Sequence, residues 1–387
     1  MSEQSDYAVL DSPPVLQNPA AHGVTVVWAV KTLATGWVEY GETPQLGQRA
    51  DAPVLGQHLV SERFMRVRIG GIEAGKPLYY RVAAAPVSFG AGSAVECGEP
   101  EFSEMYCWTP LDENAAQASF VVINDTHSRE EVLAALMPQI VADPADVTIW
   151  NGDIFNAVES EEDIVAQVLR PAGAAYAAEH PVLFTSGNHD YRGRYSRVLS
   201  KAISPWQDGI SRGRNFAVRQ GPLAIIGLDT IEDKPDRHPV FAGLTCHERY
   251  REEQRDWLQT ALRRPEIADA PFLIAFCHIP LWGLEGHNPG DTLEGFAYYC
   301  RHAQQLWHPL LEAAGVQLLI SGHMHHYRYD APTFEHSYGQ IVGGGPFLED
   351  EKRATLIRGR AENDSLEVVA RDLQGVEMGC WKFAPRS

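Results

Sequence analysis

The hydrophobic residues of this chain follow one pattern up to about residue 110 and a different pattern after it. In the first part, short runs rich in β-branched and aromatic residues are separated by glycine and proline, which is typical of strands joined by turns. The runs are Val24–Val30, Gly36–Tyr40, Phe64–Ile69 and Leu78–Ala83. Their near-regular spacing predicts a small antiparallel β-sandwich.

A polar segment, Thr109–Gln117, separates this region from the rest, and we expect two domains, residues 1–113 and 114–387. In the second, short apolar runs alternate with amphipathic stretches of helix length. The runs are Phe120–Ile123, Val147–Trp150, Val182–Phe184, Leu223–Leu228, Phe272–Phe276 and Val316–Ile320. The helical stretches are Glu130–Val141, Glu162–Ala178, Arg249–Leu262 and Ala303–Ala314. Apolar strands separated by helices predict an α/β architecture whose sheets are buried on both faces.

Polar residues with metal-binding side chains directly follow five of these predicted strands. They are Asn124–His127, Asn151–Asp153, Ser186–Asp190, Cys277–His278 and Gly322–His325. Ligands of α/β sheets bind at the carboxyl ends of the strands, so we expect these side chains to meet. Gly152, Gly187 and Gly322 each immediately precede a ligand-bearing position. Glycine tolerates backbone angles closed to other residues, which would let the chain turn sharply there.

The donors at these strand ends suit two metal ions better than one. The seven side chains are Asp125, His127, Asp153, Asn188, His278, His323 and His325. Seven oxygen and nitrogen ligands are too many for one tetrahedral zinc ion, but they fit two metals that share a bridging carboxylate. Such a pair orients a phosphate and provides a metal-bound hydroxide near neutral pH, which favours hydrolysis of phosphate esters. Manganese, iron and zinc all accept this mixture of ligands.

The ordered series from Asp125 to His325 resembles the calcineurin-like metallophosphoesterase superfamily. The resemblance implies an α/β (α+β) fold with a four-layer core, a double β-sandwich flanked by helices. It implies a first metal held by Asp125, His127, Asp153 and His325, and a second held by Asp153 as the bridge with Asn188, His278 and His323. It also implies that His189 contacts the phosphate and donates a proton to the leaving oxygen, with Asp190 orienting its imidazole.

The first domain resembles the fibronectin-type sandwich that precedes this core in purple acid phosphatases. Trp37–Gly41 and Gly75–Arg81 fit the style of that domain. The core differs from the purple enzymes at two positions. Asn156 stands where they carry a tyrosine ligand, and they lack a histidine at the position of His127. We therefore expect a colourless site without tyrosinate.

Composition and charge narrow the range of partners. With 32 Lys+Arg against 51 Asp+Glu, the formal net charge of −19 argues against affinity for nucleic-acid backbone or anionic membranes. An anionic substrate stays compatible, because bound cations reverse the sign of the charge inside a pocket. We see no secretory signal, and six scattered cysteines without CxxC spacing indicate reduced thiols in a cytoplasmic protein. A hairpin bridge between Cys97 and Cys107 is the alternative.

These features predict a hydrolase of phosphomonoesters or small phosphodiesters, with an oligomeric state that the sequence leaves open. A cyclic-nucleotide phosphodiesterase of the class III type is the nearest alternative, and a non-catalytic metal-binding scaffold and a nuclease are more distant ones. Tyr191, Arg192 and Arg194 follow the predicted proton donor, where they either grip a substrate phosphate or form a solvated loop. His287, in a glycine-rich stretch, is a further candidate for substrate contact.

Overall fold

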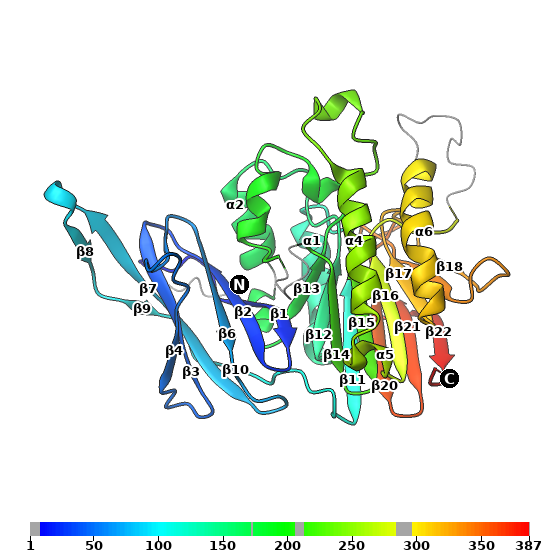
Figure 1. The fold of residues 1–387 in the computed structure, drawn as a ribbon, viewed down its shortest axis with the longest axis horizontal. Coiled ribbons are helices and arrows are strands. Elements are labelled where there is room, and N and C mark those ends of the chain that lie inside the picture. The colour runs from blue at the N-terminus through cyan, green and yellow to red at the C-terminus, as the bar shows by residue number, and fades with distance from the viewer. Residues whose placement is uncertain (1–7, 172, 206–212, 284–295, 387) are drawn as a thin grey trace. The chain divides into compact units, whose positions relative to one another are not determined.

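The computed structural model describes residues 8–171, 173–205, 213–283 and 296–386, and the chain forms two compact units (Figure 1). The first unit comprises Met1–Leu111, Glu159–Val182 and Arg197–Ser204. The second unit comprises Asp112–Val158, Leu183–Ser196 and Pro205–Ser387. Two later segments of the chain therefore pack with the N-terminal strands.

The first unit is built mainly from antiparallel strands. They are β1 (Val15–Ala20), β2 (Gly23–Ala29), β3 (Ala34–Gly41), β4 (Gln48–Ala50), β5 (Val60–Ser61), β6 (Phe64–Gly70), β7 (Leu78–Phe89), β8 (Val95–Cys97), β9 (Glu101–Phe102) and β10 (Tyr106–Trp108). β2 pairs with β1 and β6, and a second sheet runs in the order β10-β7-β3-β4. Alternate residues of β2, Val24, Val26 and Trp28, are buried in one core with Val38 and Tyr80 of the second sheet.

All four strands predicted in this region are present, although β7 extends six residues beyond the predicted end at Ala83. The strand β1 was not predicted, because Gln17, Asn18 and Pro19 interrupt its apolar pattern. Asn18 has a positive φ of 50°, and the register with β2 shifts between Gln17 and Ala20. A bulge of this kind places polar residues inside a strand and hides it from the sequence pattern.

The second unit contains two further sheets. Its strands are β11 (Gln117–Ile123), β12 (Val147–Asn151), β13 (Val182–Thr185), β14 (Phe216–Gln220), β15 (Leu223–Leu228), β16 (Phe272–Cys277), β17 (Leu318–Ser321), β18 (Arg328–Asp330), β19 (Gly339–Val342), β20 (Thr355–Glu362), β21 (Leu366–Asp372) and β22 (Glu377–Phe383). One sheet includes the order β22-β21-β20-β11-β12-β13, and the other has the order β14-β15-β16-β17-β19-β18. β11 and β12 are parallel, as are β15, β16, β17 and β19, so within each set the carboxyl ends lie at one edge.

The two sheets of the second unit face one another. Phe120 of β11 and Phe276 of β16 make an edge-to-face contact with 5.6 Å between ring centroids. The helices of this unit are α1 (Glu130–Ala142), α4 (His247–Ala261), α5 (Pro265–Ala268) and α6 (Phe296–Ala313). α4 and α6 cover the opposite face of β15, β16 and β17, with Trp257 and Trp307 buried there (Figure 1). The mixed α/β fold expected from the sequence is confirmed.

One predicted helix is wrong. Glu162–Ala178 is divided into α2 (Glu161–Ile164), a π-helical turn (Val165–Leu169) and α3 (Ala174–Ala177). Pro171 and Gly173 lie at the break, where proline lacks an amide hydrogen and glycine takes a φ of 84°. The C-terminal strands were also missed; in β20, Arg358 and Arg360 interrupt the apolar run.

Among the described residues, no helix combines the length and the apolar character needed to cross a membrane. The sequence has six cysteines, and the five whose side chains the structure describes all carry free thiols. Cys97 and Cys107 are among them, so the hairpin bridge considered from the sequence is not formed.

Candidate metal centre

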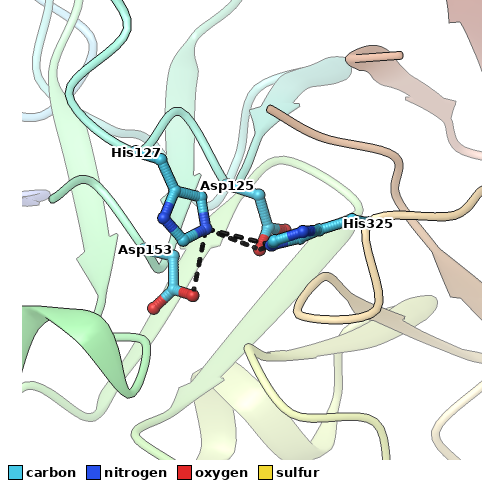
Figure 2. Close-up of side chains that lie close together, drawn as sticks. All are labelled: Asp125, His127, Asp153 and His325. Carbon is cyan, nitrogen blue, oxygen red and sulfur yellow. Dashed lines mark hydrogen bonds and ion pairs between the residues drawn. The ribbon is translucent and has the colours of Figure 1, made fainter. Parts of the chain in front are cut away.

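Side chains that follow four strands of the second unit converge in space. Asp125 follows β11, Asp153 follows β12, His278 follows β16 and His325 follows β17. Two groups of potential ligands result, and within each the ligand atoms all lie within 4.8 Å of one another. The first group is Asp125, His127, Asp153 and His325 (Figure 2), and the second group is Asp153, His278 and His323. The structure thus brings together every aspartate and histidine predicted as a ligand.

In the first group, ring nitrogens and carboxylate oxygens face a common centre (Figure 2). The Nε2 atoms of His127 and His325 lie 3.0 Å apart. Asp125 Oδ1 lies 3.2 Å from His325 Nε2, and Asp153 Oδ2 lies 3.4 Å from His127 Nε2. Donor atoms at these separations suit a metal ion with bonds of about 2.0–2.2 Å.

Asp153 is common to both groups. Its Oδ2 atom lies 3.4 Å from His127 Nε2 in the first group and 3.2 Å from His278 Nε2 in the second. Its Oδ1 atom accepts a hydrogen bond of 2.9 Å from the backbone amide of His189, which fixes the rotation of the carboxylate. One oxygen atom therefore faces the histidines of both groups.

The two histidines of the second group are oriented through their Nδ1 atoms. His278 Nδ1 donates to the backbone carbonyl of Asn151 at 2.8 Å, and His323 Nδ1 donates to Asn188 Oδ1 at 2.9 Å. This contact places Asn188, the seventh predicted ligand, beside the second group. In the neutral form of His278, whose proton lies on Nδ1, the buried Nε2 atom is an acceptor with no donor near it among the described residues, and the Asp153 oxygen 3.2 Å away is also an acceptor. A cation between two such acceptors would satisfy both, so the residues fit a metal.

Five residues of the two groups adopt the left-handed backbone region, which residues other than glycine rarely occupy. They are Asp125 (φ 51°), His127 (φ 48°), Asp153 (φ 50°), His323 (φ 72°) and His325 (φ 57°). Each such residue costs about 1–3 kcal/mol and persists only where its surroundings enforce it. Here the amide of Asp125 donates to Gly152 O and that of His127 to Asp153 O, both at 3.0 Å. Strain concentrated at ligand positions is typical of a functional site.

All three glycines noted in the sequence are packed too closely for a side chain, and at Gly152 a Cβ atom would lie 2.3 Å from His278 Nδ1. Gly152 has a φ of 83°, as expected for a sharp turn. Gly187 and Gly322 do not have positive φ angles, so the expectation is wrong for them. A Cβ atom on Gly187 would lie 2.2 Å from Asp153 Oδ1, and one on Gly322 would lie 2.4 Å from Asp125 Oδ2. Ligand carboxylates pack against the backbone at both positions and leave no room for a side chain.

The buried carboxylates of Asp125 and Asp153 change the pKa values of the histidines around them. Burial by itself would raise the pKa of Asp153, but the charge and hydrogen bond of His278 outweigh it and lower this pKa to about 2. Burial likewise opposes a charged His278, but Asp153 and Asp125 raise its pKa to about 10. Burial and then the charge of His278 lower the pKa of His323 to about 4. Carboxylates that hold a positive charge beside them make a donor set suited to divalent transition metals, whose binding would displace the proton of His278.

His189 lies beside the first group, but Asp190 does not orient it. The rings of His189 and His127 are in edge-to-face contact, with 4.7 Å between centroids. His189 Nδ1 donates to the backbone carbonyl of Asn156 at 2.7 Å. The carboxylate of Asp190 instead accepts hydrogen bonds from the amides of Ile154, Phe155 and Gly187. The expected contact is wrong because this buried carboxylate satisfies backbone amides of the loops.

The predicted substrate contacts lie in different surroundings. Arg192 is half-buried, and its Nη1 donates to His189 Nε2 at 2.9 Å. Tyr191 donates its hydroxyl to Asp229. Arg194 is exposed, with its guanidinium over the ring of Tyr195. His287 lies outside the described residues.

The sequence did not reveal several supporting contacts. Asn124 Nδ2 donates to Asp125 Oδ2 at 2.5 Å, and His127 Nδ1 donates to Asn156 Oδ1 at 3.0 Å. Glu232 and Asp233, which bind Arg192, were not singled out at all. They lie in the segment that follows β15, so the search for polar residues after predicted strands, which located the metal ligands, would have pointed to this segment.

Comparisons with known proteins give a family and a fold. Residues 118–327 match the family described as Calcineurin-like phosphoesterase, whereas no curated protein sequence matches. A purple acid phosphatase, PPD1, from yellow lupin (Lupinus luteus) seeds is similar with a TM-score of 0.66 and 13% identity, over 96% of this chain and 74% of the lupin chain. A structure of PhoD is similar with a TM-score of 0.65 and 13% identity, over 98% of this chain and 90% of that chain. A dimetal phosphatase from Danio rerio is similar with a TM-score of 0.50 and 13% identity, over 70% of this chain and 99% of that chain.

At this level of identity the structural likenesses show a shared fold. The family match extends over more than half of the chain and includes every predicted metal ligand from Asp125 to His325. The expectation of a phosphoesterase is thereby confirmed, and the two ligand groups agree with the dinuclear metal centre that such enzymes use. The chain belongs to the calcineurin-like phosphoesterase family.

Proposed function

We propose that this chain hydrolyses phosphate esters at two metal ions. The observation that carries the proposal is the position of Asp153, whose Oδ2 atom faces His127 Nε2 at 3.4 Å and His278 Nε2 at 3.2 Å. An oxygen atom between two sets of imidazole nitrogens is suited to bridging two cations. When bound, the metals would supply an activated water as the nucleophile and neutralise charge on the phosphate.

We assign a ligand set to each metal. The first set is Asp125, His127, Asp153 and His325, and the second is Asp153, Asn188, His278 and His323. Manganese, iron and zinc all suit these donors. Asn156 accepts a hydrogen bond from His127 Nδ1, on the side of the ring away from Nε2, so it orients this imidazole toward the metal. With asparagine instead of tyrosine here, we expect a colourless protein.

His189 is the proposed proton donor to the leaving oxygen. The carbonyl of Asn156 accepts from its Nδ1 atom, so the transferred proton would be carried by Nε2, which accepts from Arg192 Nη1 in the structure. Burial lowers the pKa of His189, and the negative charge of a bound phosphate would raise it again. Arg192, whose Nη1 lies 2.9 Å from this Nε2 atom, is the proposed contact for a phosphate oxygen.

The proposed substrate is a phosphomonoester or a small phosphodiester. Similar solved structures include a purple acid phosphatase and a dimetal phosphatase, which supports phosphate-ester chemistry. The formal net charge of −19 supports a small substrate over a nucleic-acid backbone or an anionic membrane.

We further propose that residues 1–113 form a fibronectin type III-like domain and residues 114–387 the catalytic domain. The antiparallel strands β1, β2 and β6 and the sheet β10-β7-β3-β4, which share one core, support the first assignment. Structural support is the proposed role of this domain. Five free thiols support a cytoplasmic location.

Metal analysis and a substrate panel test the proposed function. The protein is loaded with manganese, iron or zinc and assayed with bis-p-nitrophenyl phosphate, p-nitrophenyl phosphate and cyclic nucleotides. We expect two metal ions per chain and hydrolysis that a chelator abolishes. A protein that binds none of the three metals at saturation, or a rate that chelation leaves unchanged, would contradict the proposal.

A further inference from the structure

The segment that follows β15 carries two adjacent carboxylates, Glu232 and Asp233, which we call the acidic pair. Both are buried, with 1% and 8% of their surface exposed. Helix α4 holds this segment through Arg251, whose Nε donates to Thr230 O at 2.9 Å and whose Nη2 donates to Glu232 O at 2.7 Å. Gln254 of the same helix makes two further hydrogen bonds with the backbone of Asp229. The acidic pair therefore lies on a rigid backbone.

The acidic pair binds Arg192 through the Nε and Nη2 edge of its guanidinium. Arg192 Nε donates to Glu232 Oε1 at 2.7 Å, and Nη2 donates to Glu232 Oε2 at 3.2 Å. Nη2 also donates to Asp233 Oδ1 at 3.1 Å. Two parallel hydrogen bonds to one carboxylate fix both the position and the plane of a guanidinium. Nη1, the guanidinium nitrogen that does not contact the acidic pair in these hydrogen bonds, donates to His189.

The acidic pair also connects this arginine to the ligand groups. Asp233 Oδ2 accepts a hydrogen bond of 3.4 Å from Asn188 Nδ2. Arg192 Nη1 donates to His189 Nε2 at 2.9 Å. Residues assigned to metal binding and to proton transfer therefore both touch the Arg192–acidic pair unit.

The charges within this unit balance. Lys234 Nζ lies 2.5 Å from Asp233 Oδ1 and 3.7 Å from Glu232 Oε2, so two cations face two carboxylates. Arg192 can thus donate hydrogen bonds to a phosphate without adding net positive charge. Burial of Glu232 and Asp233 strengthens their electrostatic pairing with these two cations.

We propose that the acidic pair makes this site selective for singly charged phosphodiesters over doubly charged phosphomonoesters, by neutralising Arg192 while holding it in place. The inference rests on the proposed function and specifies its substrate class. A second negative charge on the substrate would gain no net attraction from this unit, because Arg192 and Lys234 are already paired with Glu232 and Asp233, whereas an unpaired arginine here would favour the doubly charged monoester. Glu232 and Asp233 are positioning residues here, because they act through Arg192.

Paired measurements with the same leaving group test the inference. The kcat/KM values for bis-p-nitrophenyl phosphate and p-nitrophenyl phosphate are compared at a pH where the monoester carries two charges. We expect the wild-type protein to prefer the diester, and Glu232→Gln to shift the ratio about tenfold toward the monoester. Asp233→Asn should shift the ratio in the same direction. The matched control is Glu253→Gln, an exposed carboxylate paired with Arg249 on α4, which should leave the ratio unchanged.

A binding measurement complements the kinetics. Calorimetry with metal-loaded protein compares inorganic phosphate with dimethyl phosphate, and Glu232→Gln should tighten phosphate binding more than dimethyl phosphate binding. A purely structural role would weaken both ligands alike, and metal content determined in parallel shows whether the ligand groups are intact.

The outcomes separate this inference from the proposed function. An active wild-type protein that prefers the monoester, or unchanged ratios in both variants, would overturn the selectivity while leaving the hydrolase intact. A protein that binds metals but hydrolyses neither ester would overturn the proposed function and this inference with it. Should Glu232→Gln fail to fold, Asp233→Asn and the wild-type preference still decide the question.

Discussion

The two ligand groups and the Arg192–acidic pair unit adjoin one another in the second unit, but they are held in place by different forces. The ligand groups are positioned by backbone: residues such as Asp125 and Asp153 follow parallel strands and adopt strained angles that backbone hydrogen bonds enforce. The arginine is positioned by side chains, through hydrogen bonds and ion pairs to Glu232 and Asp233. Backbone strain thus holds the proposed metal ligands, whereas paired charges are proposed to set the preference for a substrate, which single substitutions can change.

The largest expected effect is that of Asp153→Asn, which tests the ligand groups. The substitution keeps the shape of the side chain but removes the negative charge that faces both groups. We expect metal content to fall and kcat/KM to drop by about a thousandfold or more, since metal ions contribute several kcal/mol to such reactions. Metal analysis and steady-state kinetics measure this, with Asp364→Asn, an exposed aspartate, as the control. Two tightly bound metals in the variant would refute the bridging role.

His189→Gln sharpens the comparison, because it should separate rate from metal binding. The side chain is proposed to transfer a proton without binding metal, so we expect full metal content with kcat lowered by about 10²–10⁴-fold. The decrease should be smaller for a substrate whose leaving group needs no proton, such as a nitrophenyl ester. Turnover of an alkyl phosphate equal to that of the wild type would contradict the assignment.

Gly187→Ala tests how tightly the backbone packs against the ligand groups. The new Cβ atom would lie 2.2 Å from Asp153 Oδ1 and 2.4 Å from Asp153 N, so the carboxylate must move. We expect metal affinity to fall by about 10–100-fold, similar to the loss of a supporting contact. Gly70→Ala is the control, since its Cβ would have no atom within 4 Å. Metal titration of both variants measures this affinity. An unchanged affinity in Gly187→Ala would show that Asp153 can move without loss of metal binding.

Substitution of Asn156 should have the smallest effect on metal binding and activity, because this residue orients two histidines and is not itself a proposed metal ligand. Its side chain accepts from His127 Nδ1, and its backbone carbonyl accepts from His189 Nδ1. We expect Asn156→Ala to weaken metal binding about tenfold, and Asn156→Asp, which retains an acceptor, to restore most of it. If both variants bound the metals as tightly as the wild type, the hydrogen bond from His127 to Asn156 would make no contribution to metal affinity. The Ala variant should lose less activity than His189→Gln, since the backbone carbonyl remains.

Much of the fold and most of the ligands were predictable because they depend on local pattern. The apolar runs at β11, β12, β15 and β16 are long enough to identify as strands, and ligands follow three of them directly. The prediction failed where polar or glycine and proline residues interrupt an element, as in β1 and at Pro171. It also failed for Asp190, since nothing in Gly187–Asp190 shows whether a carboxylate faces an imidazole or three backbone amides.

The sequence by itself determined which residues could bind metals and at which strand ends they stand, since strand and ligand are adjacent along the chain. Only the tertiary structure decided that one oxygen of Asp153 faces two histidines, that Gly187 packs against this carboxylate, and that Glu232 grips Arg192. These contacts join residues between 26 and 125 positions apart, in different loops. The folded backbone alone fixes such distances, because nothing in the local pattern of either partner encodes the other.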